Sequence, residues 1–273
     1  MARTGSTTLA LPPFDGATRR IVLLCLSVFF AQALLSWVLT APLFALIFGH
    51  LALVPRDLLR GQIWQPLTYA FMPLGLLGEF LTLIFFWFLG AMLEEERGSR
   101  WLYEMFFTAA IGGALLASVI SFTHVLNLSE TDIGFGPYAG IYGLLIAVLI
   151  WMPEREFLIF FIIRLKAKYF VIIYLLIDTA RLLLHAAPFD ALVNLSGALC
   201  GFLFLKYVPR RGLTYALSER YFSLRNEYYR SKRRRAAKKF EVYMRSQNRE
   251  VHFDKNGKYV DPDENPTDKR WMN

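Results

Sequence analysis

The stretch GFGPYAGIYGLL, from Gly134 to Leu145, has the pattern of a glycine-rich turn that leads into an apolar helix. The helix pattern continues without a charge to Trp151, and Gly140 and Gly143 lie three residues apart within it. Small residues on a helix surface allow neighbouring helices to approach closely in lipid. We therefore predict a turn followed by a tightly packed membrane helix.

The apolar residues of the chain are concentrated in long runs. They make up 55% of the 273 residues, and the run IVLLCLSVFFAQALLSWVLTAPLFALIF (Ile21 to Phe48) contains no charge. About 20 apolar residues cross the hydrocarbon core, and a signal-peptide core has only roughly 7–15. A polytopic membrane protein is predicted. Cys25 and Cys200 lie inside apolar runs without the spacing of metal ligands, so we expect no metal and no cofactor.

Six apolar segments indicate six membrane-spanning helices. The last three segments are short, and short spans occur where neighbouring helices shield their ends. The predicted fold class is an all-α membrane protein, a six-transmembrane-helix bundle followed by a basic helical tail. The predicted spans are about 21–47, 74–93, 102–122, 138–151, 169–185 and 191–207.

The basic residues give these spans an orientation. Of the 30 Lys and Arg residues, 27 fall on one side of the predicted membrane, Arg56 and Arg60 on the other, and Arg181 within a span. Because Lys and Arg accumulate on the cytoplasmic side, both termini are predicted to be cytoplasmic. The predicted parts are a cytoplasmic N-terminal tail (1–20), the six-span membrane domain (21–209) and a basic cytoplasmic C-terminal tail (210–273).

The first outer loop, HLALVPRDLLRGQIWQPLTYAF (His50 to Phe71), is half apolar. It contains Trp64 and Tyr69, whose amphipathic rings favour the level of the lipid headgroups. We predict a short helical loop that lies in the outer interface.

Four sequence patterns follow one another in an order and spacing that resemble the rhomboid family of intramembrane serine proteases. The resemblance covers about residues 45–210 and implies the six-helix rhomboid fold. The patterns are GQIWQPLTYAFMP, GEFLTLIFFWFLGAMLEEERGS, GPYAGIYGLL and NLSGALCGFLF. The family's small helix-packing residues match Gly90, Gly140, Gly143, Gly197 and Gly201.

The resemblance also implies where catalytic groups would lie. Rhomboids use a serine in a GxSG turn and a histidine in an HxxGxxxG pattern, because a neutral hydroxyl needs a base to take its proton. Here Tyr138 occupies the serine position and Asn194 the histidine position. The family's HxxxN pair, which stabilises the oxyanion, corresponds to Gly78 and Thr82. The resemblance therefore predicts a pseudoprotease without catalytic residues.

We expect Tyr138 and Asn194 to fill the former active-site cavity. A buried phenolic hydroxyl normally has a hydrogen-bond partner, and our hypothesis is that these two side chains bond to each other. Ser196 is the strongest candidate for a replacement nucleophile, but none of the four histidines shares its helical face.

Three charged residues fall inside predicted spans, where charges are costly and mark a function or a partner. Asp178 and Arg181, three residues apart on the fifth span, are predicted to pair. Glu79, early in the second span, is predicted to lie near enough to the outer interface to reach water.

The tail segment ALSERYFSLRNEYYRSKRRRAAKKFEVYMRSQ (Ala216 to Gln247) contains no Gly or Pro and predicts one long helix. Asn256-Gly257 predicts a hairpin, and the last residues are expected to be disordered. The basic centre is a solvated flank, a surface for anionic lipid, or a docking site for protein or RNA. No RNA-binding motif is present, which disfavours nucleic acid, and interleaved aromatic residues favour a protein. The basic residues are Lys232, Arg233, Arg234, Arg235, Lys238 and Lys239.

Inactive rhomboids bind membrane-protein clients and influence their traffic, folding or degradation. The resemblance thus implies a non-proteolytic protein that binds such clients or serves as an accessory or scaffold subunit of a larger membrane complex. The alternative is an active intramembrane serine peptidase with unusual catalytic residues. The short spans favour a bacterial inner membrane.

Overall fold

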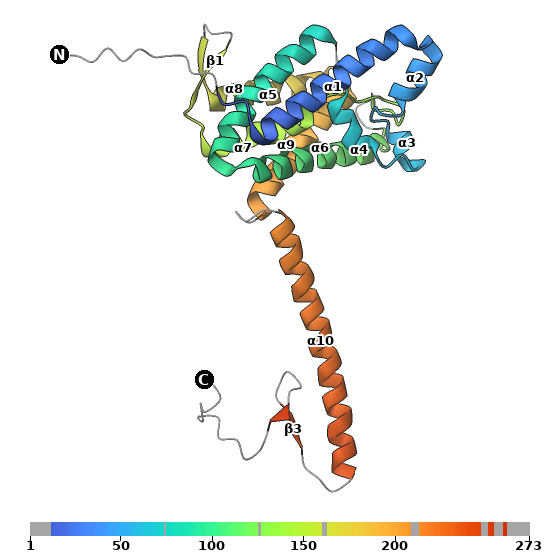
Figure 1. Cartoon of the computed structure of the whole chain (residues 1–273), viewed down its shortest axis with the longest axis vertical. Helices are drawn as coiled ribbons and strands as arrows, with labels where there is room; N and C mark the ends of the chain where they lie inside the picture. Colours follow the sequence, from blue (N-terminus) through green and yellow to red (C-terminus); the bar gives the residue numbers. More distant parts are fainter. Residues whose placement is uncertain are drawn as a thin grey trace, which may run out of the picture. The chain divides into compact units, whose positions relative to one another are not determined.

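The structure is a computed structural model that divides the chain into two compact units, Met1–Gly212 and Leu213–Asn273. The first unit is a bundle of helices, which Figure 1 labels from α1 to α9. The residues that the structure describes are 12–73, 75–124, 127–159, 163–208, 213–246, 251–253 and 259–260.

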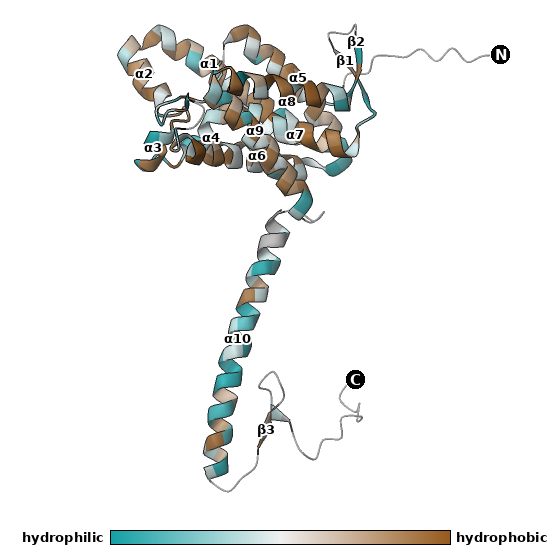
Figure 2. Cartoon of the chain, turned by 180° about the vertical axis from the view of Figure 1, so that it is seen from behind, coloured by the Kyte–Doolittle hydropathy of each residue, from teal (hydrophilic) through white to brown (hydrophobic). Residues whose placement is uncertain are grey.

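The centre of the bundle is α9 (Pro188–Tyr207), which packs against α6 (Ser99–Ser121), α7 (Tyr138–Trp151) and α8 (Ala167–Leu183). Figure 2 shows that apolar residues predominate along the helices of this unit. Buried side chains are concentrated where α6, α7 and α9 meet, so these three helices form the interior of the bundle.

The periphery of the bundle includes α1 (Gly16–Val38) and α5 (Leu76–Arg97), which pack against each other. Within the described residues, α1, α5, α6 and α9 are long and apolar enough to cross a membrane. The remaining predicted spans are shorter, because α7 has 14 residues and α8 has 17. These helices make the chain an integral membrane protein.

The first apolar run is two helices, so the prediction of a single span over 21–47 is wrong. α1 ends at Val38, Leu39 and Thr40 are extended, and α2 (Ala41–Gly49) follows. The cause is Pro42, the second residue of α2. A proline inside a helix lacks its N–H and clashes with the carbonyl four residues earlier, which belongs to Val38, the last residue of α1.

Glycines set the close contacts between α6, α7 and α9. A Cβ atom at Gly197 would lie 2.5 Å from the carbonyl oxygen of Ala139, and one at Gly113 would lie 2.8 Å from the Gly197 nitrogen. A Cβ atom at Gly201 would lie 2.6 Å from the Gly143 Cα. The three backbones therefore approach one another at distances that only glycine permits.

Two further glycines make room for side chains. Gly140 of α7 faces the Phe106 ring, which a Cβ atom would approach to 2.4 Å. Gly90 of α5 faces Thr18 of α1, and a Cβ atom there would lie 2.8 Å from the threonine hydroxyl. These contacts allow α6 and α1 to lie close to their neighbours.

Glu94, near the end of α5, caps the start of α1. Its carboxylate accepts bonds from the backbone N–H groups of Ala17 (2.6 Å) and Thr18 (2.9 Å), and from the hydroxyls of Thr18 and Ser99. The first N–H groups of a helix have no intrahelical partner, and negative charge is stabilising there. Glu94 thereby ties α1 to α5.

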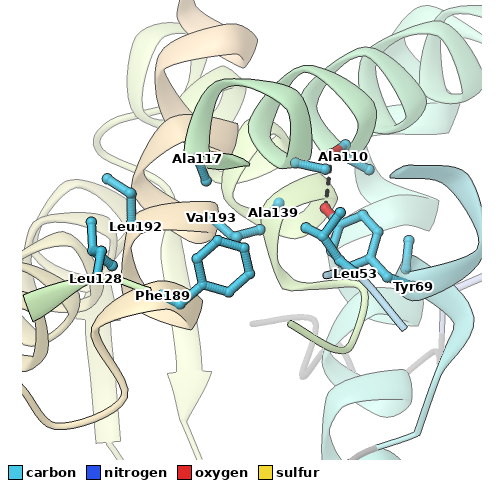
Figure 3. Close-up of a cluster of buried hydrophobic side chains, with 11 residues drawn as sticks. Leu53, Tyr69, Ala110, Ala117, Leu128, Ala139, Phe189, Leu192 and Val193 are labelled. Atoms are coloured by element: carbon cyan, nitrogen blue, oxygen red, sulfur yellow. Dashed lines mark hydrogen bonds between the residues drawn. The ribbon is translucent and has the colours of Figure 1, made fainter. Parts of the chain in front are cut away.

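The loop predicted to be the first outer loop consists of short helices: α3 (Pro55–Leu59), α4 (Gln65–Thr68) and the 3₁₀ helix η1 (Tyr69–Phe71). The Tyr69 hydroxyl is buried and donates to the Ala110 carbonyl over 2.8 Å, a bond drawn in Figure 3. These short helices agree with the predicted helical loop.

The outer loop holds the turn that precedes α7. Leu53 and Gly134 form an isolated antiparallel bridge through two backbone bonds. The Gly136 N–H donates to the Tyr69 carbonyl over 2.9 Å. Apolar side chains from the loop, the turn and α9 pack beside these bonds, among them Leu53, Phe189 and Val193 (Figure 3). The turn that positions Tyr138 is thus anchored on two sides.

A β-hairpin that the sequence analysis did not predict lies between α7 and α8. Its strands, β1 (Glu156–Ile159) and β2 (Ile163–Lys166), pair antiparallel. The exposed Glu154 carboxylate binds the ammonium groups of Lys166, at 2.7 Å, and Lys168, at 2.5 Å. These bonds join the start of the hairpin to its end.

We predict that Glu154 titrates near pH 2. The hydrogen bonds from Lys166 and Lys168 hold its carboxyl pKa at about 2, below the ordinary 4.5. Because the folded pKa is depressed, the ion pairs contribute fully above about pH 4.5 and are lost as the pH falls through about 2. A carbon-13 NMR titration of Glu154 measures this midpoint, and Lys166→Gln with Lys168→Gln returns it towards 4.5. An ordinary midpoint in the unmutated protein contradicts the prediction.

The second unit contains α10 (Leu213–Ser246), where one helix from Ala216 to Gln247 is predicted. Strands β3 (His252–Phe253) and β4 (Tyr259–Val260) pair antiparallel in the segment where a hairpin is predicted. The predicted Asn256-Gly257 turn, the predicted disordered end and most of the N-terminal tail lie outside the described residues.

Candidate functional site

The turn before α7 places Tyr138 against α5. Gly136 adopts a φ of +91°, in the region that favours glycine, and Pro137 is the N-cap of α7. Tyr138, the first residue of α7, places its hydroxyl 2.9 Å from the Thr82 hydroxyl of α5. Thr82 is buried and Tyr138 half-buried. Two of the four positions that the sequence analysis singled out therefore meet in one hydrogen bond.

Asn194 lies on α9 and binds a carboxylate on α8. Its amide donates to the Asp178 Oδ2 over 2.9 Å, and Asn194 is 7% exposed. The other carboxylate oxygen, Oδ1, accepts from Arg181 at 2.8 Å, so the predicted pair of Asp178 and Arg181 is confirmed. Asp178 is 2% exposed. A buried carboxylate needs such partners, because an unpaired charge in an apolar environment is strongly disfavoured.

Tyr138 and Asn194 have different partners, so the predicted bond between them is wrong. The phenol bonds to α5 through Thr82, and the amide bonds to α8 through Asp178. A threonine hydroxyl and a carboxylate satisfy the two groups separately. The result is two bonds that tie α7 to α5 and α9 to α8.

Gly78 does not join this site. It lies one helical turn before Thr82 on α5, is exposed, and has nothing within 4 Å of where its Cβ would be. The next residue, Glu79, is 3% exposed, so the prediction that it reaches water is wrong. Cys25 of α1 interacts electrostatically with Glu79, which places this carboxyl beside α1.

Tyr142 is a member of the site that the sequence analysis did not single out. It follows Tyr138 by one turn of α7, and its hydroxyl donates to the Tyr174 carbonyl over 3.2 Å. Its phenol also interacts with Asp178, and its ring packs edge-on against the ring of Tyr174 at 6.3 Å. The spacing of four residues between the two tyrosines was the signal available in the sequence, because it places both on one helical face.

The Tyr138 hydroxyl is bonded to another hydroxyl, and the Asn194 amide is bonded to a carboxylate. An amide nitrogen, as in Asn194, is a donor and cannot accept a proton as imidazole does. Neither the Tyr138–Thr82 bond nor the Asn194–Asp178 bond includes a histidine. Across the described part of the chain, no group of three or more His, Cys, Asp or Glu side chains could hold a metal ion.

Comparison with protein families gives a match to the Rhomboid domain over residues 60–211, more than half of the chain. The chain belongs to the rhomboid family. A search of curated proteins found no significant match. The matched region of this rhomboid begins in the outer loop and includes every helix from α4 to α9.

The bond between Tyr138 and Thr82 joins α7 to α5 in this rhomboid, and its contribution is measurable. We expect Tyr138→Phe to lower the free energy of unfolding by about 0.6–1 kcal/mol, the usual net contribution of one such bond. Thr82→Val should cost a similar amount, and the double variant little more than either. Thermal unfolding in a mild detergent measures this coupling. Fully additive effects would contradict the bond.

Proposed function

We propose that this rhomboid is a pseudoprotease, a non-proteolytic membrane protein that binds membrane-protein clients or serves as an accessory or scaffold subunit of a membrane complex. The observation that carries the proposal is the bond between Thr82 and Tyr138, the residue that the resemblance places at the family's serine position. The residue at the family's base position, Asn194, is bonded to Asp178.

The chemistry of these groups supports the loss of proteolysis. Acyl transfer by a hydroxyl needs a base within hydrogen-bond reach, and the partner of the Tyr138 hydroxyl is another hydroxyl. Stabilisation of an oxyanion needs preorganised donors, and Gly78 has no side chain to supply one. The polar side chains that remain bind neighbouring helices, as expected of a retained fold that no longer cleaves.

We propose the following membrane arrangement for this function. Six helices, α1 and α5 to α9, cross the bilayer, with the short helices α7 and α8 shielded within the bundle, and both termini are cytoplasmic. The chain then has three parts with separate roles: the N-terminal tail (1–20), the membrane domain (21–209) and the basic tail (210–273). The charge asymmetry supports this topology, and the membrane is the inner membrane of a bacterium.

The alternative is an active rhomboid-type peptidase with unusual residues, and membership of a protease family favours it. Such an enzyme would need a nucleophile other than Tyr138. Ser196 is the strongest candidate, but its side chain is buried on α9 and is 4% exposed.

Affinity purification in mild detergent tests the binding function. We expect a membrane protein to co-purify with the full-length chain, identified by mass spectrometry. A shortened version that ends at Arg211 shows whether the partner binds the membrane domain or the tail. A partner retained by both versions would bind the membrane domain, and a partner retained only by the full-length chain would bind the tail. A monodisperse protein without enriched partners would contradict the proposal.

A further inference from the structure

The long helix α10 has two chemically different sides. At 100° per residue, its three acidic residues, Glu219, Glu227 and Glu241, all fall on one side. The opposite side carries four basic residues and no acidic one. It also carries most of the helix's aromatic residues, and we call it the aromatic–basic face. Its aromatic residues are Tyr221, Phe222, Tyr228, Tyr229, Phe240 and Tyr243, and its basic residues are Arg225, Lys232, Arg235 and Lys239.

The aromatic–basic face is exposed, whereas the side with the acids is partly covered. Ala237, 8% exposed, is the most buried of the described side chains of α10, and Glu241 and Met244 are half-buried on the same side. In contrast, Tyr221 and Tyr228 are 61% and 64% exposed. Figure 2 shows that α10 is mostly hydrophilic, with a few hydrophobic positions scattered along it. Near the C-terminal end of this face the Phe240 ring lies edge-on to the Phe253 ring of β3, with centroids 6.2 Å apart. The rest of the aromatic–basic face, from Tyr221 to Lys239, is exposed.

We propose that the aromatic–basic face binds the surface of an anionic lipid bilayer. Tyrosine rings favour the headgroup level, where the ring is shielded and the hydroxyl stays wet. Each basic side chain near an anionic surface strengthens binding about fivefold, and no carboxylate on this face opposes that attraction. Arg225 lies over the Tyr229 ring, 5.6 Å from its centroid, so rings and cations are presented together.

A short connection tethers the first residue of α10 to the last residue of a helix long enough to be a membrane span. Five residues, 208–212, join α9 to α10, and they span at most about 18 Å. α9 is long and apolar enough to be a membrane span. A bilayer is therefore present at high effective concentration, whereas an RNA or a soluble protein must be recruited from solution. This difference favours lipid over other anionic partners.

The proposal divides the basic centre that the sequence analysis treated as one patch. Lys232, Arg235 and Lys239 lie on the aromatic–basic face and would contact lipid. The other three predicted residues, Arg233, Arg234 and Lys238, lie outside it and are exposed to solvent. The inference does not depend on whether the bundle cleaves peptides, since it needs only that α9 lies in a membrane.

The test uses the full-length protein in nanodiscs of phosphatidylcholine, with or without about 30% phosphatidylglycerol. Hydrogen–deuterium exchange of the α10 amides reports docking. We expect exchange about tenfold slower in the anionic discs.

Two variants remove the same amount of charge from opposite sides of the helix. The first is Arg225→Gln, Lys232→Gln, Arg235→Gln and Lys239→Gln, and the matched control is Arg220→Gln, Arg230→Gln, Arg234→Gln and Lys238→Gln.

The first variant should lose the protection and the control should keep it. Equal exchange in the two kinds of disc, or equal loss in the two variants, would overturn the proposal. Protection that appears only when RNA is added would also overturn it, and would assign the face to nucleic acid. Circular dichroism of each variant shows whether the helix itself persists, so that lost docking is distinguished from lost folding.

Discussion

Replacing Gly197 with valine should lower the free energy of unfolding by about 3 kcal/mol, the upper range for overpacking a core. A Cβ atom at Gly197 would lie 2.5 Å from the carbonyl oxygen and 2.7 Å from the Cα of Ala139. Both are backbone atoms at the crossing of α9 and α7, so no side-chain rotation relieves the clash. Thermal unfolding of the purified protein in mild detergent measures the loss.

Gly78→Ala is the matched control, because this glycine is exposed and nothing lies within 4 Å of where its Cβ would be. Alanine in a helix is about 0.5–1 kcal/mol more favourable than glycine, so this variant should be unchanged or slightly stabilised. A Gly197→Val protein as stable as the unmutated one would show that the helices do not cross this closely.

Replacing Asp178 with alanine should cost about 1–3 kcal/mol, the usual effect of leaving a buried hydrogen-bonding group, here the Asn194 amide, without its partner. The 2%-exposed carboxylate accepts bonds from both Asn194 and Arg181. Its loss leaves the buried Asn194 amide without a partner and the guanidinium of Arg181 without its counter-ion. The expected result is a lowered unfolding midpoint in detergent and reduced recovery from the membrane.

Glu154→Gln is the control for this second prediction. It removes a carboxylate that also binds two cations, Lys166 and Lys168, but on an exposed hairpin. Surface ion pairs contribute little to stability, so the unfolding midpoint should not change. If Asp178→Ala behaved like this control, the carboxylate would not hold α8 against α9.

Much of the bundle could be predicted from the sequence because long charge-free runs have few alternatives. Residues 138–151 were predicted as a span and α7 has the same bounds. The break at Leu39 was missed, although Pro42 was visible, because a long apolar run suggests a single span. The β1–β2 hairpin was missed for a related reason. Its segment, FLIFFIIRLK, is rich in apolar residues, including β-branched isoleucines. In so short an apolar run, periodicity does not distinguish a strand from a helix.

The site was only partly predictable, because hydrogen-bond partners are a property of tertiary packing. The family resemblance located Tyr138, Thr82 and Asn194, but not which of them meet. Thr82 is 56 residues from Tyr138 in the chain, and no local pattern links them. The pair of Asp178 and Arg181 was accessible from its helical spacing, whereas the contact of Asn194 with Asp178 joins two helices and was not.

Labelling of the purified full-length protein with a fluorophosphonate probe tests the loss of proteolysis most directly. An active rhomboid protease in the same detergent serves as the positive control for the probe. We predict that the control is labelled and that this chain is not, because the partner of its Tyr138 hydroxyl is the Thr82 hydroxyl, which is not a base. Covalent labelling that disappears when one serine, such as Ser196, is replaced by alanine would contradict the account and identify an active peptidase.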